Sequence, residues 1–193
     1  MPYVGRGGLK MENFLRESGI PPPSCHILDL GASTGGFTDC LLQSGAKGAT
    51  CIDVGHGQLH YKLRTDPRVT NFEKTNIRSL KPEEVQGSPF SFVVMDLSFI
   101  SLRKVLSSAW NFVKSKGILV ALVKPQFECR KQEADQTRGI IRDEKIRRRV
   151  VHEIIDFAQN ELPMSELVEN VEASPAGTDG NREFFLAWKK TLQ

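Results

Sequence analysis

Short apolar runs alternate with helical patterns along the first part of the chain. Strands are expected at 27–30, 49–54, 69–72, 92–95 and 117–123. Between them, residues 37–43 and about 102–113 have helical spacing. Near-continuous apolar runs are typical of parallel strands that are covered on both faces. The alternation of such strands with helices predicts a doubly wound α/β sheet with helices on both faces.

The last part of the chain has a different pattern. The polar stretch 125–143 has no clear periodicity and fits a lid, a binding loop or a disordered segment. Residues 145–162 then repeat apolar side chains at helical spacing up to Pro163. Two strands follow, at 166–173 and 183–188, and the connector between them has no room for a helix. A parallel crossover needs about a dozen residues, so the last strand is expected to be antiparallel to its neighbour.

The size of the chain fits one ordinary globular domain. It has 193 residues, of which 39% are hydrophobic. We divide it into an N-terminal segment with a short helix, 1–23, and a main domain, 24–193. The N-terminal segment is the only part for which packing outside the main sheet is left open.

The composition of the chain says more about its cellular location than about its function. A net charge of +3 neither requires nor excludes a nucleic-acid partner. No apolar run approaches the roughly 20 residues that span a bilayer, and the first residues lack an apolar signal-peptide core. We interpret the four cysteines as small buried thiols rather than disulfides or metal ligands, so no metal site is expected and a cytoplasmic location is predicted. They are Cys25, Cys40, Cys51 and Cys129.

A glycine-rich turn joins the first strand to the first helix, at the nucleotide-binding position of a Rossmann-like sheet. Ser33 stands where the dinucleotide fingerprint has the glycine that lets a pyrophosphate approach. A cofactor without pyrophosphate, S-adenosyl-L-methionine, is therefore favoured over an NAD-type cofactor or a purely structural turn. The candidate cofactor-binding residues of this segment are Asp29, Gly31, Ala32, Ser33, Gly35, Gly36 and Phe37.

Two further residues extend this candidate cofactor site. Asp53 ends the second strand, where a carboxylate can accept both ribose hydroxyls of an adenosine. Asn76 is a candidate for contact with the adenine, although a loop asparagine equally often caps a turn. Asp29 is expected to lie near the ammonium group of the cofactor.

Three charged residues are expected to meet at one edge of the sheet. Asp96 and Lys124 each end a predicted parallel strand, and ligands of doubly wound sheets bind beyond those carboxyl ends. Glu183 begins the antiparallel strand, so it lies at the same edge.

With these residues in place, the chain resembles the methyltransferase domain of TlyA-type proteins. These proteins are often labelled hemolysins and lie within the FtsJ-like ribose 2′-O-methyltransferases. The matching segments are 3–10, 28–37, 96–101, 123–128 and 174–184. The chain departs from the family at Gly5, where serine is usual, and it is expected to lack the S4-like RNA-binding domain that usually precedes this segment.

The resemblance implies S-adenosylmethionine as cofactor, ribosomal RNA or a ribosomal subunit as partner, and a Lys-Asp-Lys-Glu catalytic tetrad. Carried over to this chain, the tetrad is Lys10, Asp96, Lys124 and Glu183, and only the resemblance places Lys10. Asp96 is also expected beside the methyl donor. Lys124 has the central role, either as a cation that stabilises the developing alkoxide or as a neutral base.

Other interpretations remain open beside this one. There are two rival functions: a non-catalytic RNA-binding module of the same fold and a membrane-active hemolysin. No stable membrane insertion is expected. The sequence does not indicate the oligomeric state. Ser98 and Ser101 are interpreted as helix caps. A basic cluster at the start of the last helix fits either RNA phosphate contacts or a solvated face. It consists of Arg142, Lys145, Arg147, Arg148 and Arg149.

Overall fold

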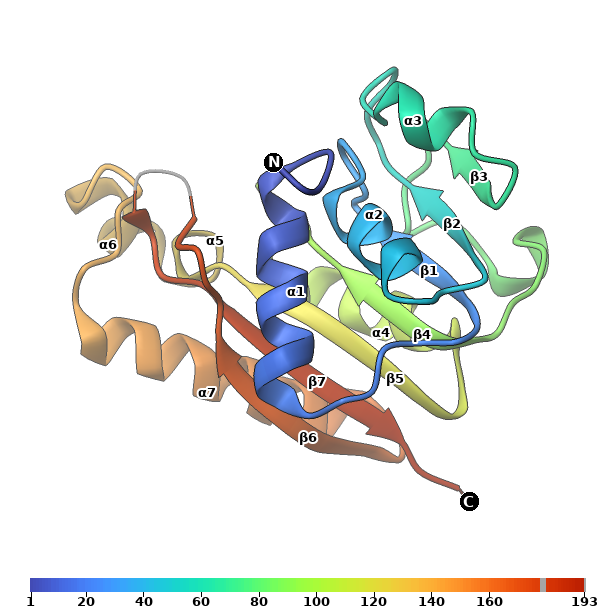
Figure 1. The fold of residues 1–193 in the computed structure, drawn as a ribbon. Helices are drawn as coiled ribbons and strands as arrows, with labels where there is room; N and C mark the ends of the chain where they lie inside the picture. The colour runs from blue at the N-terminus through green and yellow to red at the C-terminus, as the bar shows by residue number, and fades with distance from the viewer. Residues whose placement is uncertain (178–179, 193) are drawn as a thin grey trace.

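The computed structural model describes residues 1–177 and 180–192. Its centre is a seven-stranded sheet of order β3-β2-β1-β4-β5-β7-β6 (Figure 1). Strands β1 to β5 are parallel, whereas β7 is antiparallel to both β5 and β6. This confirms the predicted sheet and its antiparallel last strand. The strands are β1 (His26–Leu30), β2 (Gly48–Ile52), β3 (Val69–Phe72), β4 (Phe90–Met95), β5 (Val113–Val123), β6 (Ser165–Glu172) and β7 (Phe184–Lys190).

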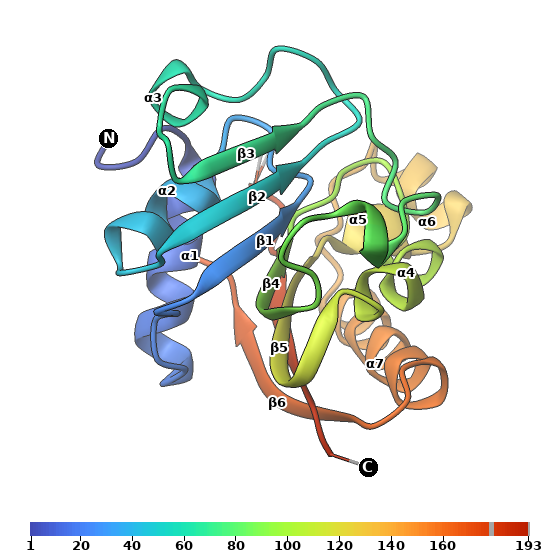
Figure 2. The same cartoon turned by 90° about the vertical axis from the view of Figure 1, so that its right-hand side faces the viewer.

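Helices cover both faces of the sheet (Figure 2). One layer contains α1 (Arg6–Ser18), α2 (Gly36–Gln43) and α3 (Tyr61–Arg64), and the other contains α4 (Leu106–Trp110) and α7 (Glu144–Glu161). Side chains of a strand alternate between the layers, because successive residues point to opposite faces. In β4, Val94 packs in the α1–α2 layer, while Val93 and Met95 pack in the α4–α7 layer.

The N-terminal segment packs directly on the sheet. Met11 and Phe14 of α1 are buried, and the Phe14 ring centroid lies 4.9 Å from that of Phe185 in β7. Helix α1 also lies beside α2 (Figure 1), where Gly36 lets the two backbones touch. This packing carries Lys10 toward the edge of the sheet at which β7 begins.

Two expected segments differ in the structure. The helix expected at about 102–113 is divided into a 3-10 turn, η2 (Leu102–Lys104), and the short α4. It ends earlier than expected, because Val113 already pairs with Phe90 as the start of β5. The polar stretch 125–143 contains two short helices, α5 (Pro125–Glu128) and α6 (Lys131–Gln136). Proline suits the first position of a helix, so the residue that follows Lys124 begins α5. A further 3-10 turn, η1, spans Pro82–Glu84.

Candidate active site

Four charged residues meet at the carboxyl edge of the central strands. Asp96 directly follows β4 and Lys124 directly follows the neighbouring β5, and Lys124 Nζ lies 2.6 Å from Asp96 Oδ1. Glu183 directly precedes β7, whose first residue lies opposite the last residue of β5. Lys10 Nζ donates to Glu183 Oε2 at 2.5 Å. The structure therefore brings the four residues of the expected tetrad together as two ion pairs.

The two ion pairs differ in exposure. Lys10 and Glu183 are buried, whereas Asp96 and Lys124 are half-buried and open to solvent on one side. Lys124 Nζ also donates to Ser98 Oγ at 2.8 Å. The interpretation of Ser98 as a helix cap was wrong, because the following 3-10 turn begins only at residue 102. Ser101 is the cap, and its Oγ accepts from the backbone N–H of Arg103.

Two adjoining cavities lie beside this edge, and both are lined by Gly31, Ser33, Asp96 and Ser98. The β2-side cavity has a volume of about 320 Å³ and the middle cavity about 200 Å³. Small-molecule sites usually measure about 300–1,000 Å³, so the two together are large enough for a cofactor. The β2-side cavity also contains Leu30, Ile52, Asp53, Val54, Gln58, Thr75, Ile77, Leu97 and Phe99; the middle cavity also contains Gly7, Asp29, Ala32, Thr34, Gly36, Phe37 and Lys124.

The rim of the β2-side cavity holds a fixed carboxylate. Asp53 Oδ2 accepts from the backbone N–H of Ser33 at 2.8 Å, and its Oδ1 accepts from Gly55 N–H at 2.7 Å. Gly31 has a φ of 79°, and a Cβ there would lie 2.5 Å from the Asp96 carbonyl oxygen. The glycine therefore lets the turn after β1 pass against the segment after β4, which brings both sides of the cavity together.

The middle cavity contains a buried carboxylate oxygen without a partner. Asp29 Oδ2 accepts from Thr38 Oγ1 at 2.7 Å, whereas Oδ1 has no hydrogen-bond partner among the described residues. Burial raises the pKa of Asp29 to about 7. A buried acceptor normally has a donor, and the ammonium group of S-adenosylmethionine would supply one. The free acceptor in this cavity therefore fits the ammonium group of the expected cofactor.

The remaining predicted cofactor residues occupy different positions. Ala32, Gly36 and Phe37 line the middle cavity. Gly35 is the N-cap of α2, and a Cβ at this position would collide with the side chains of Leu59 and Leu63. Asn76 Oδ1 accepts from the backbone N–H of Arg78, so this side chain caps a turn, and its neighbours Thr75 and Ile77 line the β2-side cavity. Contact between Asn76 and an adenine stays a prediction.

A third cavity, which we call the β5-side cavity, adjoins the tetrad on the other side. Its volume is about 360 Å³, and it shares Ser98 and Lys124 with the middle cavity. The Phe99 side chain is 90% exposed, and its ring centroid lies 5.1 Å from that of Phe127. The sequence pattern does not mark these aromatic residues as part of a site, although each lies three positions after a tetrad residue. The other lining residues are Gln126, Phe127, Arg138, Gly139, Asn181 and Glu183.

The basic cluster at the start of α7 is used partly inside the molecule. Arg147 is buried and donates to the carbonyl oxygen of Ile141. Arg149 pairs with Glu133 and Glu153. The three other members of the cluster, Arg142, Lys145 and Arg148, are exposed and remain open to contacts with phosphates.

Comparison with known proteins agrees with the geometry. The family model of the FtsJ-like methyltransferases matches residues 3–190. YqxC of Bacillus subtilis is 41% identical over 185 residues, which are 95% of this chain and 64% of YqxC. The 16S/23S rRNA (cytidine-2′-O)-methyltransferase TlyA of Mycobacterium tuberculosis is 43% identical over 190 residues, which are 98% of this chain and 69% of that protein.

A solved structure agrees over almost the whole chain. A protein from Streptococcus thermophilus that bears the hemolysin name superimposes with a TM-score of 0.92 at 38% identity, over 99% of this chain and 68% of that chain. The chain thus spans about two thirds of the length of these relatives.

Proposed function

This chain belongs to the FtsJ-like methyltransferase family, and from that premise we propose that it transfers a methyl group from S-adenosyl-L-methionine to a ribose 2′-hydroxyl of ribosomal RNA. The relative TlyA is named for this reaction on cytidine, so cytidine is the nucleotide to test first. The proposed location is the cytoplasm, where ribosomal RNA is available.

The observation that carries the proposal is the position of the Asp96–Lys124 pair. Asp96 lines the β2-side and middle cavities, and Lys124 lines the middle and β5-side cavities. The pair therefore lies where a cofactor on one side would meet a substrate on the other. This arrangement supports a group transfer across the pair.

The cofactor would be held by residues that line the β2-side and middle cavities. Asp53 would bind the ribose of the adenosine, and Asp29 Oδ1 would accept from the ammonium group. S-adenosylmethionine supplies an electrophilic methyl group when bound. Gly31, whose Cβ position would collide with the Asp96 carbonyl, keeps the turn close to the tetrad.

The chemistry assigned to this chain is control of charge at the attacking hydroxyl. A ribose hydroxyl becomes a good nucleophile only as its proton leaves. The Lys124 ammonium is held by Asp96 Oδ1 at 2.6 Å and by Ser98 Oγ at 2.8 Å. These two contacts hold Lys124 Nζ between the middle and β5-side cavities. There, as a cation, it would stabilise the developing alkoxide while the hydroxyl proton passes to water; as a neutral amine, it would take that proton itself. Lys10 and Glu183, as a buried pair, would position the ribose of the RNA in the β5-side cavity.

Membrane lysis is a weaker candidate. Within residues 1–177 and 180–192, no helix is long and apolar enough to cross a bilayer. A non-catalytic RNA-binding module of the same fold remains the other alternative, and it predicts RNA binding without transfer.

The test is transfer of a labelled methyl group to naked rRNA and to isolated ribosomal subunits, followed by mapping of the modified nucleotide. Lys124→Ala should abolish transfer while calorimetry shows cofactor affinity close to that of the native chain. Lys114→Ala is the matched control, because this exposed lysine lies at the other end of β5, the strand that Lys124 directly follows. Full transfer by Lys124→Ala would refute the role of Lys124, and a methyl group on a base would refute the substrate chemistry. Binding of RNA without any transfer would support the non-catalytic module.

A further inference from the structure

Glu128 is a buried carboxylate that the proposed chemistry does not use. It ends α5, four positions after Lys124, and only 6% of its surface is exposed. Burial of an ionised carboxylate is costly unless hydrogen bonds compensate it. The groups that donate hydrogen bonds to the Glu128 carboxylate therefore show which segment Glu128 holds in place.

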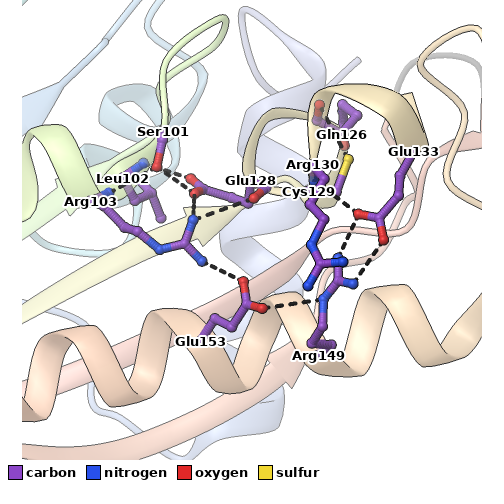
Figure 3. A network of polar contacts seen from close by, with 10 residues as sticks. All are labelled: Ser101, Leu102, Arg103, Gln126, Glu128, Cys129, Arg130, Glu133, Arg149 and Glu153. Atoms are coloured by element: carbon purple, nitrogen blue, oxygen red, sulfur yellow. Dashed lines mark hydrogen bonds and ion pairs between the residues drawn. The ribbon is translucent and has the colours of Figure 1, made fainter. Parts of the chain in front are cut away.

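All the donors to the Glu128 carboxylate come from the segment after β4. Oε1 accepts from the backbone N–H of Leu102 at 2.6 Å, and Oε2 accepts from Ser101 Oγ at 2.6 Å. The guanidinium group of Arg103 lies 3.4 Å from Oε2. Figure 3 shows these three residues gathered around the end of the Glu128 side chain. The carboxylate therefore joins the segment after β4 to the segment after β5.

The same two segments meet a second time at the active edge. There, Ser98 Oγ accepts from Lys124 Nζ at 2.8 Å, and the rings of Phe99 and Phe127 lie 5.1 Å apart. These residues line the β5-side cavity. A shift of either segment at Glu128 would thus change the width of that cavity and the direction of the Lys124 ammonium.

We propose that Glu128 is a positioning residue, which holds the Ser98–Phe99 segment at a fixed distance from Lys124 and so sets the geometry of the RNA-side cavity. This role rests on the proposed function. Ser98 also borders the cofactor cavities, but the carboxylates proposed to hold the cofactor, Asp53 and Asp29, are fixed by contacts with other groups. Loss of Glu128 should therefore affect use of RNA more than binding of the cofactor.

A second layer of charges supports this connection. Arg103 reaches Glu153 of α7 at 2.8 Å, and Glu153 lies 3.2 Å from Arg149, which pairs with Glu133 of α6 (Figure 3). Glu153 is 41% exposed, so its ion pairs contribute little by themselves. The buried Glu128 is the member whose removal should matter most.

The Glu128→Gln variant separates the effect of the hydrogen bonds of this side chain from the effect of its charge. Its amide oxygen can accept from Leu102 N–H, and its amide NH₂ can donate to Ser101 Oγ, because a hydroxyl group is both donor and acceptor. Glu128→Gln should therefore keep both hydrogen bonds, whereas Glu128→Ala loses both. Glu128→Asp keeps the charge but is one methylene shorter, so it should resemble Glu128→Ala.

Four variants test the proposal: Glu128→Ala, Glu128→Asp, Glu128→Gln and Trp110→Phe. Trp110→Phe is the stability control, because it removes a partly buried hydrogen bond to Pro163 near Lys190, at the opposite edge of the sheet. Steady-state methyl transfer to rRNA gives kcat and KM, calorimetry gives the cofactor Kd, and thermal denaturation gives Tm. Hydrogen exchange measures amide protection over residues 97–103 without requiring activity.

Glu128→Ala and Glu128→Asp should reduce kcat/KM for RNA by about 10²-fold, the usual effect of a misplacement of about 1 Å. Their cofactor Kd should stay within about twofold of the native value, and Glu128→Gln should recover most of the activity. Trp110→Phe should lower Tm with native kcat/KM. Faster exchange over 97–103 should appear in Glu128→Ala and Glu128→Asp alone.

Two results would overturn the positioning role. One is native kcat/KM in Glu128→Ala with a lowered Tm, as in the Trp110→Phe control. The other is unchanged protection of residues 97–103 in Glu128→Ala; if that variant does not fold, Glu128→Asp and Ser101→Ala decide the same point. Failure of the proposed function looks different, because the native chain itself would then transfer no methyl group, while hydrogen exchange would still decide whether Glu128 holds the segment.

Discussion

Lys10 and Glu183 form a buried ion pair although they are 173 positions apart in the chain. The Lys10 Nζ and Glu183 Oε2 atoms are 2.5 Å apart, and the two side chains are 10% and 4% exposed. Because Glu183 lines the β5-side cavity, the pair links the N-terminal helix directly to the proposed RNA side of the site. Helix α1 is therefore part of the proposed active site.

The first prediction concerns this pair. Lys10→Met leaves the Glu183 carboxylate buried without its partner, which should lower the free energy of unfolding by about 3–5 kcal/mol. The double variant Lys10→Met/Glu183→Leu replaces the pair with apolar groups and should recover most of this stability, without recovering methyl transfer. Urea denaturation and labelled methyl transfer measure the two effects.

An exposed pair on the same helix provides the control. Arg16 and Glu17 are 68% and 46% exposed, so Arg16→Met should change stability by no more than about 0.5 kcal/mol. Native stability in Lys10→Met, or an active double variant, would contradict the assigned role of the pair.

The sequence predicted the sheet and three of the tetrad positions for one physical reason. Apolar runs identify parallel strands, and the ends of parallel strands share an edge, so Asp96 and Lys124 had to be neighbours. Glu183 followed from the short connector before the last strand. Lys10 depends instead on how α1 packs against α2 and β7, and local periodicity contains no information about such long-range packing.

Other site features could not be predicted because they depend on where elements begin and which way they face. Ser98 precedes a helical pattern, but the turn begins at residue 102, so Ser101 takes the cap and Ser98 accepts from Lys124. Glu128 lies in a polar stretch without periodicity, and its burial appears only when α5 packs beside η2 and α7.

The second prediction is a pH dependence of cofactor affinity. Burial raises the pKa of Asp29 to about 7. Only the ionised carboxylate attracts an ammonium group, so the affinity for S-adenosylmethionine should fall as the pH drops below about 7, approaching tenfold per unit because one proton must leave. Calorimetric Kd values between about pH 8 and pH 5.5 would show this slope. A Kd that is independent of pH in the native chain would contradict it.

Asp29→Asn gives two further signatures. Because the folded chain holds the Asp29 proton more tightly than the unfolded chain, this group lowers native stability as the pH rises from about 4 to about 7. The variant lacks this effect and should be more stable than the native chain at about pH 8. It should bind S-adenosylmethionine more weakly, yet bind 5′-methylthioadenosine, which has no ammonium group, as well as the native chain does. Equal losses for both ligands would show that Asp29 does not contact the ammonium.

The third prediction concerns the contact between α1 and α2. A Cβ on Gly36 would lie 2.8 Å from Gly8 N and 3.2 Å from Gly7 Cα. Gly36→Ala should therefore push α1 away from α2, displace Lys10 and lower the free energy of unfolding by about 1–3 kcal/mol. Methyl transfer should fall together with stability. Glu17→Ala, on the exposed surface of α1, is the control, and a fully active Gly36→Ala variant would show that α1 does not need this close approach.

The last prediction concerns the exposed aromatic side chain at the mouth of the site. Phe99 is 90% exposed beside Phe127, at the border of the β2-side and β5-side cavities. An RNA base stacked on an exposed ring typically gains about 1–3 kcal/mol, so Phe99→Ala should raise KM for RNA by about tenfold. Its Tm should stay native, and Phe99→Tyr, which keeps the ring, should behave as the native chain. Tyr61→Ala removes an aromatic side chain that is 70% exposed on α3, outside the three cavities, and should leave KM unchanged. Equal KM values for Phe99→Ala and Tyr61→Ala would exclude stacking at Phe99.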